Sequence, residues 1–264
     1  MNRNVQRLST VEDVSIYMVP AVDRAARILI MLSTNTQGMS LAEIAAATGW
    51  HKSSIHKILV TLEHHGFLDR DEATKRYSLG IELVKCGQSV LNNLHVSQSV
   101  KSYLRELADY SGETANLAIL RGTKMVIVDV VQSPVELRVS PPIGTMDPVT
   151  AKSNGKAVLA FLPPARANEI IRMDGLPAKT RNSITKVKLY QNELAAVRER
   201  GYAIDTEEFQ EGINAVSAPI FNSERQVMGT LSIIGPAFRM TKEKLRLYGR
   251  KCAEAAAHLS PLIR

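Results

Sequence analysis

Apolar and polar positions between Ser40 and Gly80 follow a helical period twice and then alternate around a short polar stretch. The first helix is expected to begin at Ser40, because Glu43 lies three residues further on and can complete a capping box. It is expected to end at Gly49, since glycine adopts the left-handed conformation without strain. The second helix has an apolar stripe at i, i+3, i+4 and i+7, formed by Ile55, Ile58, Leu59 and Leu62. The pattern therefore predicts two short helices joined by a tight turn.

The polar face of the second helix contains hydroxyl, imidazole and amine groups, and it has no acidic residue before Glu63. Its members are Ser53, His56, Lys57 and Thr61, with Lys52 and Ser54 at the N-terminal flank. Residues 67–70 and 76–79 then predict two strands, and Lys75 and Arg76 of this hairpin suit phosphate or minor-groove contacts. This order is typical of a winged helix-turn-helix, whose second helix enters the major groove of DNA. An amphipathic helical hairpin in a protein core is the alternative, because helical spacing alone is common.

The rest of the chain predicts a mixture of helices and strands around a largely antiparallel sheet. Before the helical pair, a helix is expected from Pro20, with an apolar face formed by Val22, Ala25, Ala26, Leu29 and Leu32. Later strands are expected at residues 114–120, 125–131, 137–140, 214–221 and 227–234, and helices at 96–111, 155–162, 190–200 and from Thr241 onward. The expected divisions are a mobile arm at 1–19, a DNA-binding domain at 20–80, a linker helix at 81–95 and a second domain at 96–264.

Length, charge and cysteine content narrow the class of protein. A chain of 264 residues suits about two domains. Two cysteines are too few for a zinc finger or a disulfide framework, which favours a reducing, cytoplasmic setting. The net charge is +7, yet residues 1–80 hold nine Lys/Arg and eight Asp/Glu, so the excess does not lie on the helical pair. No membrane span is expected, because no apolar run approaches the required length of about 20 residues. No signal peptide is expected either, because residues 1–17 lack the apolar core of one.

Several ordered motifs together resemble the IclR-type bacterial transcriptional regulators over nearly all of residues 19–263. They are VPAVDRAARILIML, SLAEIAAATGWHKSSIHKILVTLEHHGFLDRD, GKAVLAFLP, VRERGYAIDTEE, GINAVSAPIF, LSIIGP and RMT. The resemblance implies an α+β chain with an N-terminal winged helix-turn-helix, a linker helix and a C-terminal GAF-like α/β effector-binding domain. It also implies homodimers or dimers of dimers that bind double-stranded operator DNA and respond to a small-molecule effector, commonly an organic acid. No cofactor, metal ion or membrane partner is expected.

The resemblance also implies which residues form the effector pocket. Carried over position by position, its walls are Ser153, Asn154, Gly155, Asp205, Ile213, Ala215, Ser232 and Ile234. Asn154, Asp205 and Ser232 would orient a ligand, although Asp205 could instead cap a turn and Ser232 could simply alternate out of a strand. Two features depart from the family pattern. Lys152 stands beside the pocket, where small uncharged residues are usual, and favours an anionic effector if it points inward. Lys75 stands where the wing usually has glycine.

Two other classes of protein remain as alternatives. One is a hydrolase-like α/β enzyme with a polar pocket around Asp205. Its best feature, residues 153–156, resembles part of a phosphate-binding loop but lacks the loop's first glycine. Beyond His95 the only histidine is His258, which leaves no nearby base for a serine or cysteine nucleophile. The other class is an assembly or sensor module that does not bind DNA, and it would make the pattern between Ser40 and Gly80 coincidental.

Overall fold

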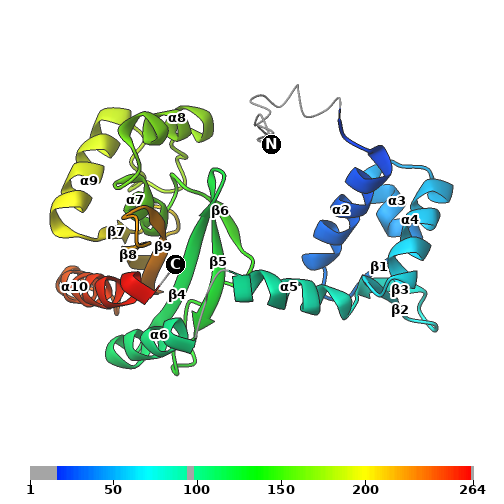
Figure 1. Ribbon diagram of the computed structural model, residues 1–264, viewed down its shortest axis with the longest axis horizontal. Helices are drawn as coiled ribbons and strands as arrows, with labels where there is room; N and C mark the ends of the chain where they lie inside the picture. The colour runs from blue at the N-terminus through cyan, green and yellow to red at the C-terminus, as the bar shows by residue number, and fades with distance from the viewer. Residues whose placement is uncertain (1–16, 94–97, 263–264) are drawn as a thin grey trace, which may run out of the picture. The chain divides into compact units, whose positions relative to one another are not determined.

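The computed structural model describes residues 17–93 and 98–262 and divides the chain into two compact units, residues 1–90 and 91–264 (Figure 1). Most of the expected arm at residues 1–19 lies outside the described residues. Helix α5 (Glu82–Asn93) follows the N-terminal unit in the chain and runs across the boundary between the units. Residues 94 and 95 of the expected linker and Val96 of the next expected helix also lie outside the described residues.

The N-terminal unit contains three helices and a small antiparallel sheet. Its helices are α2 (Pro20–Ser33), α3 (Leu41–Thr48) and α4 (Lys52–His64), and its strands are β1 (Met39–Ser40), β2 (Leu68–Arg70) and β3 (Arg76–Leu79), in the order β1-β3-β2. The predicted capping box is confirmed, because the Glu43 backbone N–H donates to Ser40 Oγ at 3.3 Å and the Ser40 N–H donates to Glu43 Oε2 at 2.7 Å. Gly49 ends α3 with φ of 70°. The winged helix-turn-helix is therefore present as predicted.

The core of this unit explains how α4 is oriented. Ile55 and Leu59 are fully buried, and Ile58 and Leu62 pack partly against the same cluster. The expected apolar face of α2 was wrong in part, because Ile28 and Leu32 are the buried residues whereas Val22 is 65% exposed. A helix rotates about its axis so that the bulkiest i, i+4 pair reaches the core.

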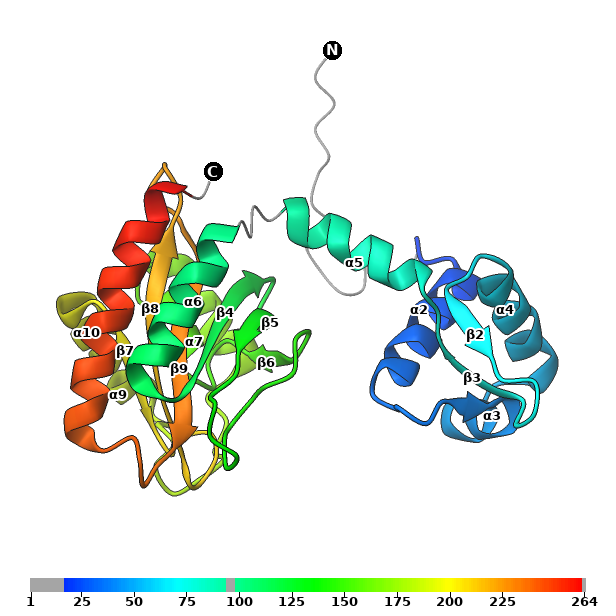
Figure 2. The ribbon, with the colours of Figure 1, turned by 90° about the horizontal axis from the view of Figure 1, so that it is seen from below.

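The C-terminal unit is built on one antiparallel sheet of six strands with helices on both faces (Figure 2). The strand order is β6-β5-β4-β9-β8-β7, with bounds β4 (Thr114–Arg121), β5 (Lys124–Val131), β6 (Met146–Pro148), β7 (Ala203–Thr206), β8 (Ile213–Phe221) and β9 (Val227–Pro236). Helices α6 (Gln98–Ser111) and α10 (Lys242–Leu259) lie side by side on one face, and a 3-10 turn at Ser260–Leu262 follows α10. Helices α7 (Ser153–Leu159), α8 (Pro164–Asp174) and α9 (Val187–Arg200) cover the other face. The arrangement is α+β, as predicted.

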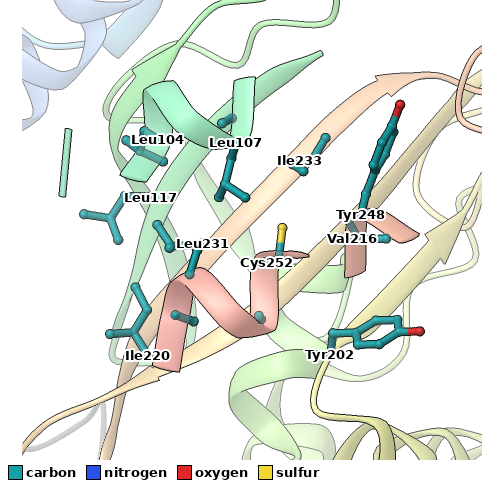
Figure 3. Close-up of a cluster of buried hydrophobic side chains, with 14 of the residues drawn as sticks. Leu104, Leu107, Leu117, Tyr202, Val216, Ile220, Leu231, Ile233, Tyr248 and Cys252 are labelled. Atoms are coloured by element: carbon teal, nitrogen blue, oxygen red, sulfur yellow. The ribbon is translucent and has the colours of Figure 1, made fainter. Parts of the chain in front are cut away.

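Each face of the sheet has its own hydrophobic core. On the side of α6 and α10, Leu104 and Leu107 pack with strand residues such as Leu231 and Ile233 and with Cys252 of α10 (Figure 3). On the other side, α7, α8 and α9 bury their apolar residues against β4 and β5. One end of this second face, around the N-terminus of α7, is lined by polar residues and is left open as a cavity.

Two expectations for this unit were wrong. Residues 137–140 form no strand, and the third strand is instead β6, which pairs Val126 of β5 with Met146. Pro141 and Pro142 have no N–H to donate to a ladder, which disfavours a strand there. No helix was expected between residues 162 and 190, but Pro164 opens α8 there, because the N–H that proline lacks would have no partner in the first turn of a helix.

Candidate functional site

The exposed face of α4 presents a row of polar and cationic side chains. Lys52, Ser53, His56, Lys57 and Thr61 are all exposed, because the opposite side of the helix is buried in the core. The Thr61 hydroxyl donates to the backbone oxygen of Lys57 at 2.8 Å, so its proton is used within the helix. The exposed ammonium groups of Lys52 and Lys57 and the hydroxyl of Ser53 remain available to a negatively charged partner.

Ser54 differs from its neighbours, because it is half-buried and faces α2. Its hydroxyl accepts a hydrogen bond of 2.9 Å from Arg24 Nη1, and the Arg24 guanidinium lies 5.4 Å from the ring centroid of Trp50. The structure thus places Ser54 where it helps to fix α4 against α2.

The wing is closed at its tip by Asp71 and Lys75. Lys75 has φ of +56°, which is the left-handed conformation that glycine adopts with less strain. Its backbone N–H donates to the backbone oxygen of Asp71 at 2.8 Å. Asp71 Oδ1 accepts from both the backbone N–H and the hydroxyl of Thr74. The Lys75 side chain is 55% exposed and pairs with Glu72 at 2.7 Å. Its ammonium is therefore accessible.

Arg76 is committed mostly to its own unit. Its Nε donates to the backbone oxygen of Gln37 at 3.1 Å, and its Nη2 donates to the backbone oxygen of Gly38 at 2.9 Å and to Glu43 Oε1 at 3.1 Å. Glu43 Oε2 is 2.9 Å from the same nitrogen. The hydrogen bonds from Ser40, followed by those from Arg76, lower the pKa of Glu43. Arg76 therefore ties the wing to the turn before α3, and only Nη1 is left over from these bonds.

A cavity of about 420 Å³ opens beside the N-terminus of α7 in the C-terminal unit. Eight of the nine residues expected to form the pocket line it: Lys152, Ser153, Asn154, Asp205, Ile213, Ala215, Ser232 and Ile234. Twelve further lining residues were not expected: Asn116, Ile127, Arg138, Val139, Ser140, Pro141, Pro142, Thr145, Asp147, Phe209, Gln210 and Ser217. The cavity is large enough for a small metabolite.

Gly155 is the expected pocket residue that does not line the cavity. A Cβ at this position would lie 1.5 Å from the backbone oxygen of Val149. The absence of a side chain lets α7 pack directly on the preceding segment, which holds Ser153 and Asn154 in the wall. Gly155 acts through backbone packing and does not offer a surface to a ligand.

The floor of the cavity is a polar row that crosses three neighbouring strands. Asn116 of β4 lies opposite Ser232 of β9, which in turn lies opposite Ser217 of β8. The hydroxyls of Ser217 and Ser232 are 2.8 Å apart, and Ser153 extends the chain with a second Oγ–Oγ distance of 2.8 Å to Ser217. Asn116 and Ser217 were missed in the sequence, because their place in this row depends on strand register.

Charged side chains also line the cavity. Lys152 Nζ is 2.7 Å from Asp147 Oδ2 and 4.1 Å from the ring centroid of Phe209, so the ammonium is held by an ion pair and by an aromatic face. Asp205 is buried, and its Oδ1 accepts from the Glu208 N–H at 2.8 Å. Burial raises the pKa of the Asp205 carboxyl, against the opposing effect of the positive charges of Lys156 and Lys152. Asp205 therefore both caps a turn and faces the cavity.

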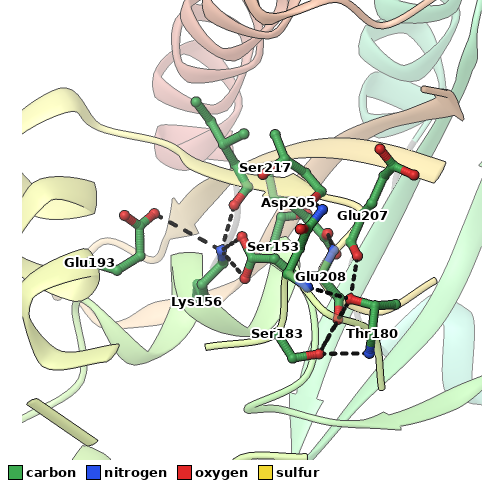
Figure 4. A network of polar contacts seen from close by, with 12 residues as sticks. Ser153, Lys156, Thr180, Ser183, Glu193, Asp205, Glu207, Glu208 and Ser217 are labelled. Atoms are coloured by element: carbon green, nitrogen blue, oxygen red, sulfur yellow. Dashed lines mark hydrogen bonds and ion pairs between the residues drawn. The ribbon is translucent and has the colours of Figure 1, made fainter. Parts of the chain in front are cut away.

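A buried ion pair holds Glu208, which directly precedes the lining residues Phe209 and Gln210 in the chain (Figure 4). Lys156 is 1% exposed, and its Nζ donates to both carboxylate oxygens of Glu208, at 2.6 and 2.7 Å, and to the Ile204 backbone oxygen. Burial raises the pKa of Glu208, and the ammonium of Lys156 acts in the opposite direction. In the sequence Lys156 was considered only as part of the fragment that resembles a phosphate-binding loop, although a lysine inside the apolar run GKAVLAF is also a visible signal for a buried pair.

The chemistry of the cavity is that of a binding site. Among the described residues that line it there is neither histidine nor cysteine, so its four serines have no such base beside them. Across residues 17–93 and 98–262, no group of three or more His, Cys, Asp or Glu side chains is placed to hold a metal ion. None of the helices in this described part is both long and apolar enough to cross a membrane.

A winged helix-turn-helix, followed in the same chain by an α/β unit with a polar cavity, defines a class of DNA-binding transcriptional regulators. The sequence model of the IclR helix-turn-helix domain matches residues 21–72, and that of the bacterial transcriptional regulator IclR C-terminal domain matches residues 88–261. The chain therefore belongs to the IclR family, and it is a regulator of transcription and not an enzyme.

Known proteins of similar length agree with this assignment. The chain is 29% identical over 243 residues to the HTH-type transcriptional regulator XynR of Escherichia coli, with 92% of this chain and 96% of the relative covered. It is 30% identical over 244 residues to the transcriptional repressor IclR of Escherichia coli, with 92% and 89% covered. The crystal structure of an IclR transcriptional regulator from Alicyclobacillus acidocaldarius has a TM-score of 0.81 at 31% identity and covers 92% of this chain and 98% of that one.

Proposed function

We propose that this protein binds double-stranded operator DNA through α4 and the wing, and that a small organic acid bound in the C-terminal cavity changes its affinity for the operator. The observation that carries the proposal is the cavity itself, which has a volume of about 420 Å³ and brings polar and charged groups together with an apolar wall. A ligand can shift the affinity for DNA only if it binds two states of the protein differently, with a typical coupling of about 1–3 kcal/mol.

The proposed DNA contacts follow from exposure. Lys52, Ser53, His56 and Lys57 project from α4 and are expected to reach base edges and phosphates in the major groove, with Thr61 further along the same face. Lys75 at the wing tip is accessible and suits a phosphate contact. We assign Ser54 and Arg76 to the same interface in supporting roles, because most of their hydrogen-bonding groups already fix α4 and the wing.

The proposed effector is an anion because of Lys152. Its ammonium lies in the cavity wall, where a ligand carboxylate can exchange with Asp147 while Phe209 continues to stabilise the charge. Asn154, Asp205 and Ser232 would orient the ligand, and Ile213, Ala215 and Ile234 would supply the apolar wall. Because Asp205 is also negative when ionised, its raised pKa favours binding of an anion as the pH falls.

We further propose that the protein acts in the cytoplasm as a homodimer or a dimer of dimers. A single winged domain covers only a few base pairs, so two-fold pairing of half-sites would lengthen the recognised sequence. The operator should then be pseudo-palindromic. A footprint limited to one half-site, together with a monomer in solution at micromolar concentration, would contradict this part of the proposal.

The proposal is tested by gel-shift and calorimetric titrations of the full chain, after a thermal-shift screen of small carboxylic acids has identified a binding acid. Asp205→Ala and Ser232→Val should keep operator affinity within about threefold, because both residues lie outside the N-terminal unit. They should weaken binding of the acid at least tenfold, which is about 1.4 kcal/mol.

Thr230→Val is the matched control, because Thr230 lies on the same strand two residues from Ser232, also loses a buried hydroxyl, and does not line the cavity. It should bind the acid like the unmodified protein. Equal binding of the acid by the protein and by both pocket variants would show that the effector site lies elsewhere.

A further inference from the structure

The side-chain oxygen of Asn116, in the cavity floor, accepts no hydrogen bond from any of the described residues. The Asn116 side chain is 3% exposed and lies among the cavity-lining residues. A buried acceptor without a donor has lost its bonds to water and has gained none in return, which is unfavourable. The position in the cavity means that a bound molecule can supply the missing donor.

The neighbouring serines leave this requirement open. Two hydrogen bonds link the hydroxyls of Ser153, Ser217 and Ser232, and three hydroxyls hold three protons, so this group of serines has one proton to spare. The serine oxygens and Asn116 Oδ1 have more lone pairs than this proton can fill, and the Asn116 amide also carries two N–H donors. The floor therefore offers both acceptors and donors, and a ligand hydroxyl, which can donate one hydrogen bond and accept another, is complementary to both.

We infer that Asn116 Oδ1 accepts a hydrogen bond from a hydroxyl group of the ligand, and that the effector is a small hydroxylated carboxylic acid. The inference rests on the proposed function, since it takes the cavity to be the effector site and places the carboxylate near Lys152. A hydroxyl suits the floor better than an ammonium does, because Asn116 and the serines are neutral and an unpaired buried cation is strongly unfavourable. Asn116 thus determines specificity for the hydroxyl.

The test compares acids that differ at one group. The three-carbon acids lactate, pyruvate, propionate and the amino acid alanine carry a hydroxyl, a keto oxygen, no polar group and an ammonium on a common frame. Mandelate and phenylacetate form a larger pair with and without the hydroxyl. In calorimetric titrations of the full chain, the hydroxy acid should bind at least tenfold tighter than its partner without the hydroxyl in at least one series, and tighter than pyruvate and alanine in the three-carbon series.

The variant Asn116→Leu keeps the approximate shape of the side chain and removes the acceptor. It should reduce the preference for the hydroxyl to less than threefold, mainly by weakening the hydroxy acid. Thr230→Val is again the matched control, because Thr230 Oγ1 is another buried oxygen without a partner among the described residues, but it lies outside the cavity. This control should keep the full preference. Thermal melts of both variants establish that each is folded.

The outcomes separate this inference from the proposed function. Acids that bind without any preference for the hydroxyl, or a preference that survives in folded Asn116→Leu, would overturn the role of Asn116 and leave the organic-acid effector in place. Tighter binding of pyruvate or alanine than of lactate would also overturn it, because the floor would then favour an acceptor or a cation. If none of the six acids binds, the organic-acid effector fails and the inference fails with it. The comparison on the unmodified protein decides the matter even if Asn116→Leu does not fold.

Discussion

Replacing Lys156 by methionine should destabilise the C-terminal unit and make its free energy of unfolding depend more strongly on pH. The substitution keeps the apolar stem of the side chain and removes the ammonium, so Glu208 loses both of its charge-assisted hydrogen bonds and Ile204 loses a donor. Removing one partner of a buried ion pair typically costs about 3–5 kcal/mol. Because the Glu208 side chain is 13% exposed and can recover some hydration, we expect a value near the lower end.

The pH dependence of this effect has a definite sign. Burial already raises the pKa of Glu208 above 4.5, and removal of the Lys156 charge, which opposes that shift, should raise it further. For an acid whose folded pKa is raised, the stability contribution is fully present below the unfolded pKa and is lost as the pH rises through the folded pKa. The loss caused by Lys156→Met should therefore be larger at pH 8 than at pH 5, because a lower pH favours the neutral form of this carboxyl.

Urea unfolding of the full chain measures both effects, with circular dichroism reporting on all helices. Fluorescence of Trp50, the chain's one tryptophan, reports on the N-terminal unit and should not change. Lys152→Met is the matched control, because its ion pair with Asp147 is more exposed, and we expect a loss of about 1 kcal/mol or less. A loss below about 1 kcal/mol for Lys156→Met at pH 8, or one that is the same at both pH values, would refute the reasoning.

Two further predictions concern backbone packing and DNA reading. Gly155→Ala should lower the melting temperature and cost about 1–3 kcal/mol or more, because its Cβ would collide with the backbone oxygen of Val149. The control Gly87→Ala, which lies in open space within α5, should stabilise the protein by about 0.5–1 kcal/mol. Equal melting temperatures for the two variants would contradict the packing role of Gly155. Lys57→Ala should cost about 1–3 kcal/mol of specific binding and relax operator discrimination, whereas Lys75→Ala should weaken binding to all sequences alike and reduce the salt slope by roughly one unit. Titrations at several salt concentrations distinguish the two, and unchanged discrimination in Lys57→Ala would mean that α4 does not read bases.

The sequence alone was sufficient to place the two helices at residues 40–62 and the turn between them, because their determinants are local. The capping box of Ser40 and Glu43, the glycine at Gly49 and the stripe containing Ile55 and Leu59 are all set by residues within a few turns of one another. The capping residues and the helical periodicity of such elements can be seen directly in the sequence. The role of Arg76 was not visible in this way, since its partners lie 33 to 39 residues away.

The tertiary structure decided how the cavity is completed. The resemblance to a family pointed to eight of the residues that line the cavity, but the floor exists only because strand register brings Asn116 of β4 and Ser217 of β8 to either side of Ser232. A slip of one residue would turn these side chains to the other face of the sheet, and no local pattern specifies that register. The pairing of Lys156 with Glu208 likewise joins residues that are 52 positions apart in the chain. Contacts between distant segments depend on how the helices and strands pack, so only the folded chain reveals them.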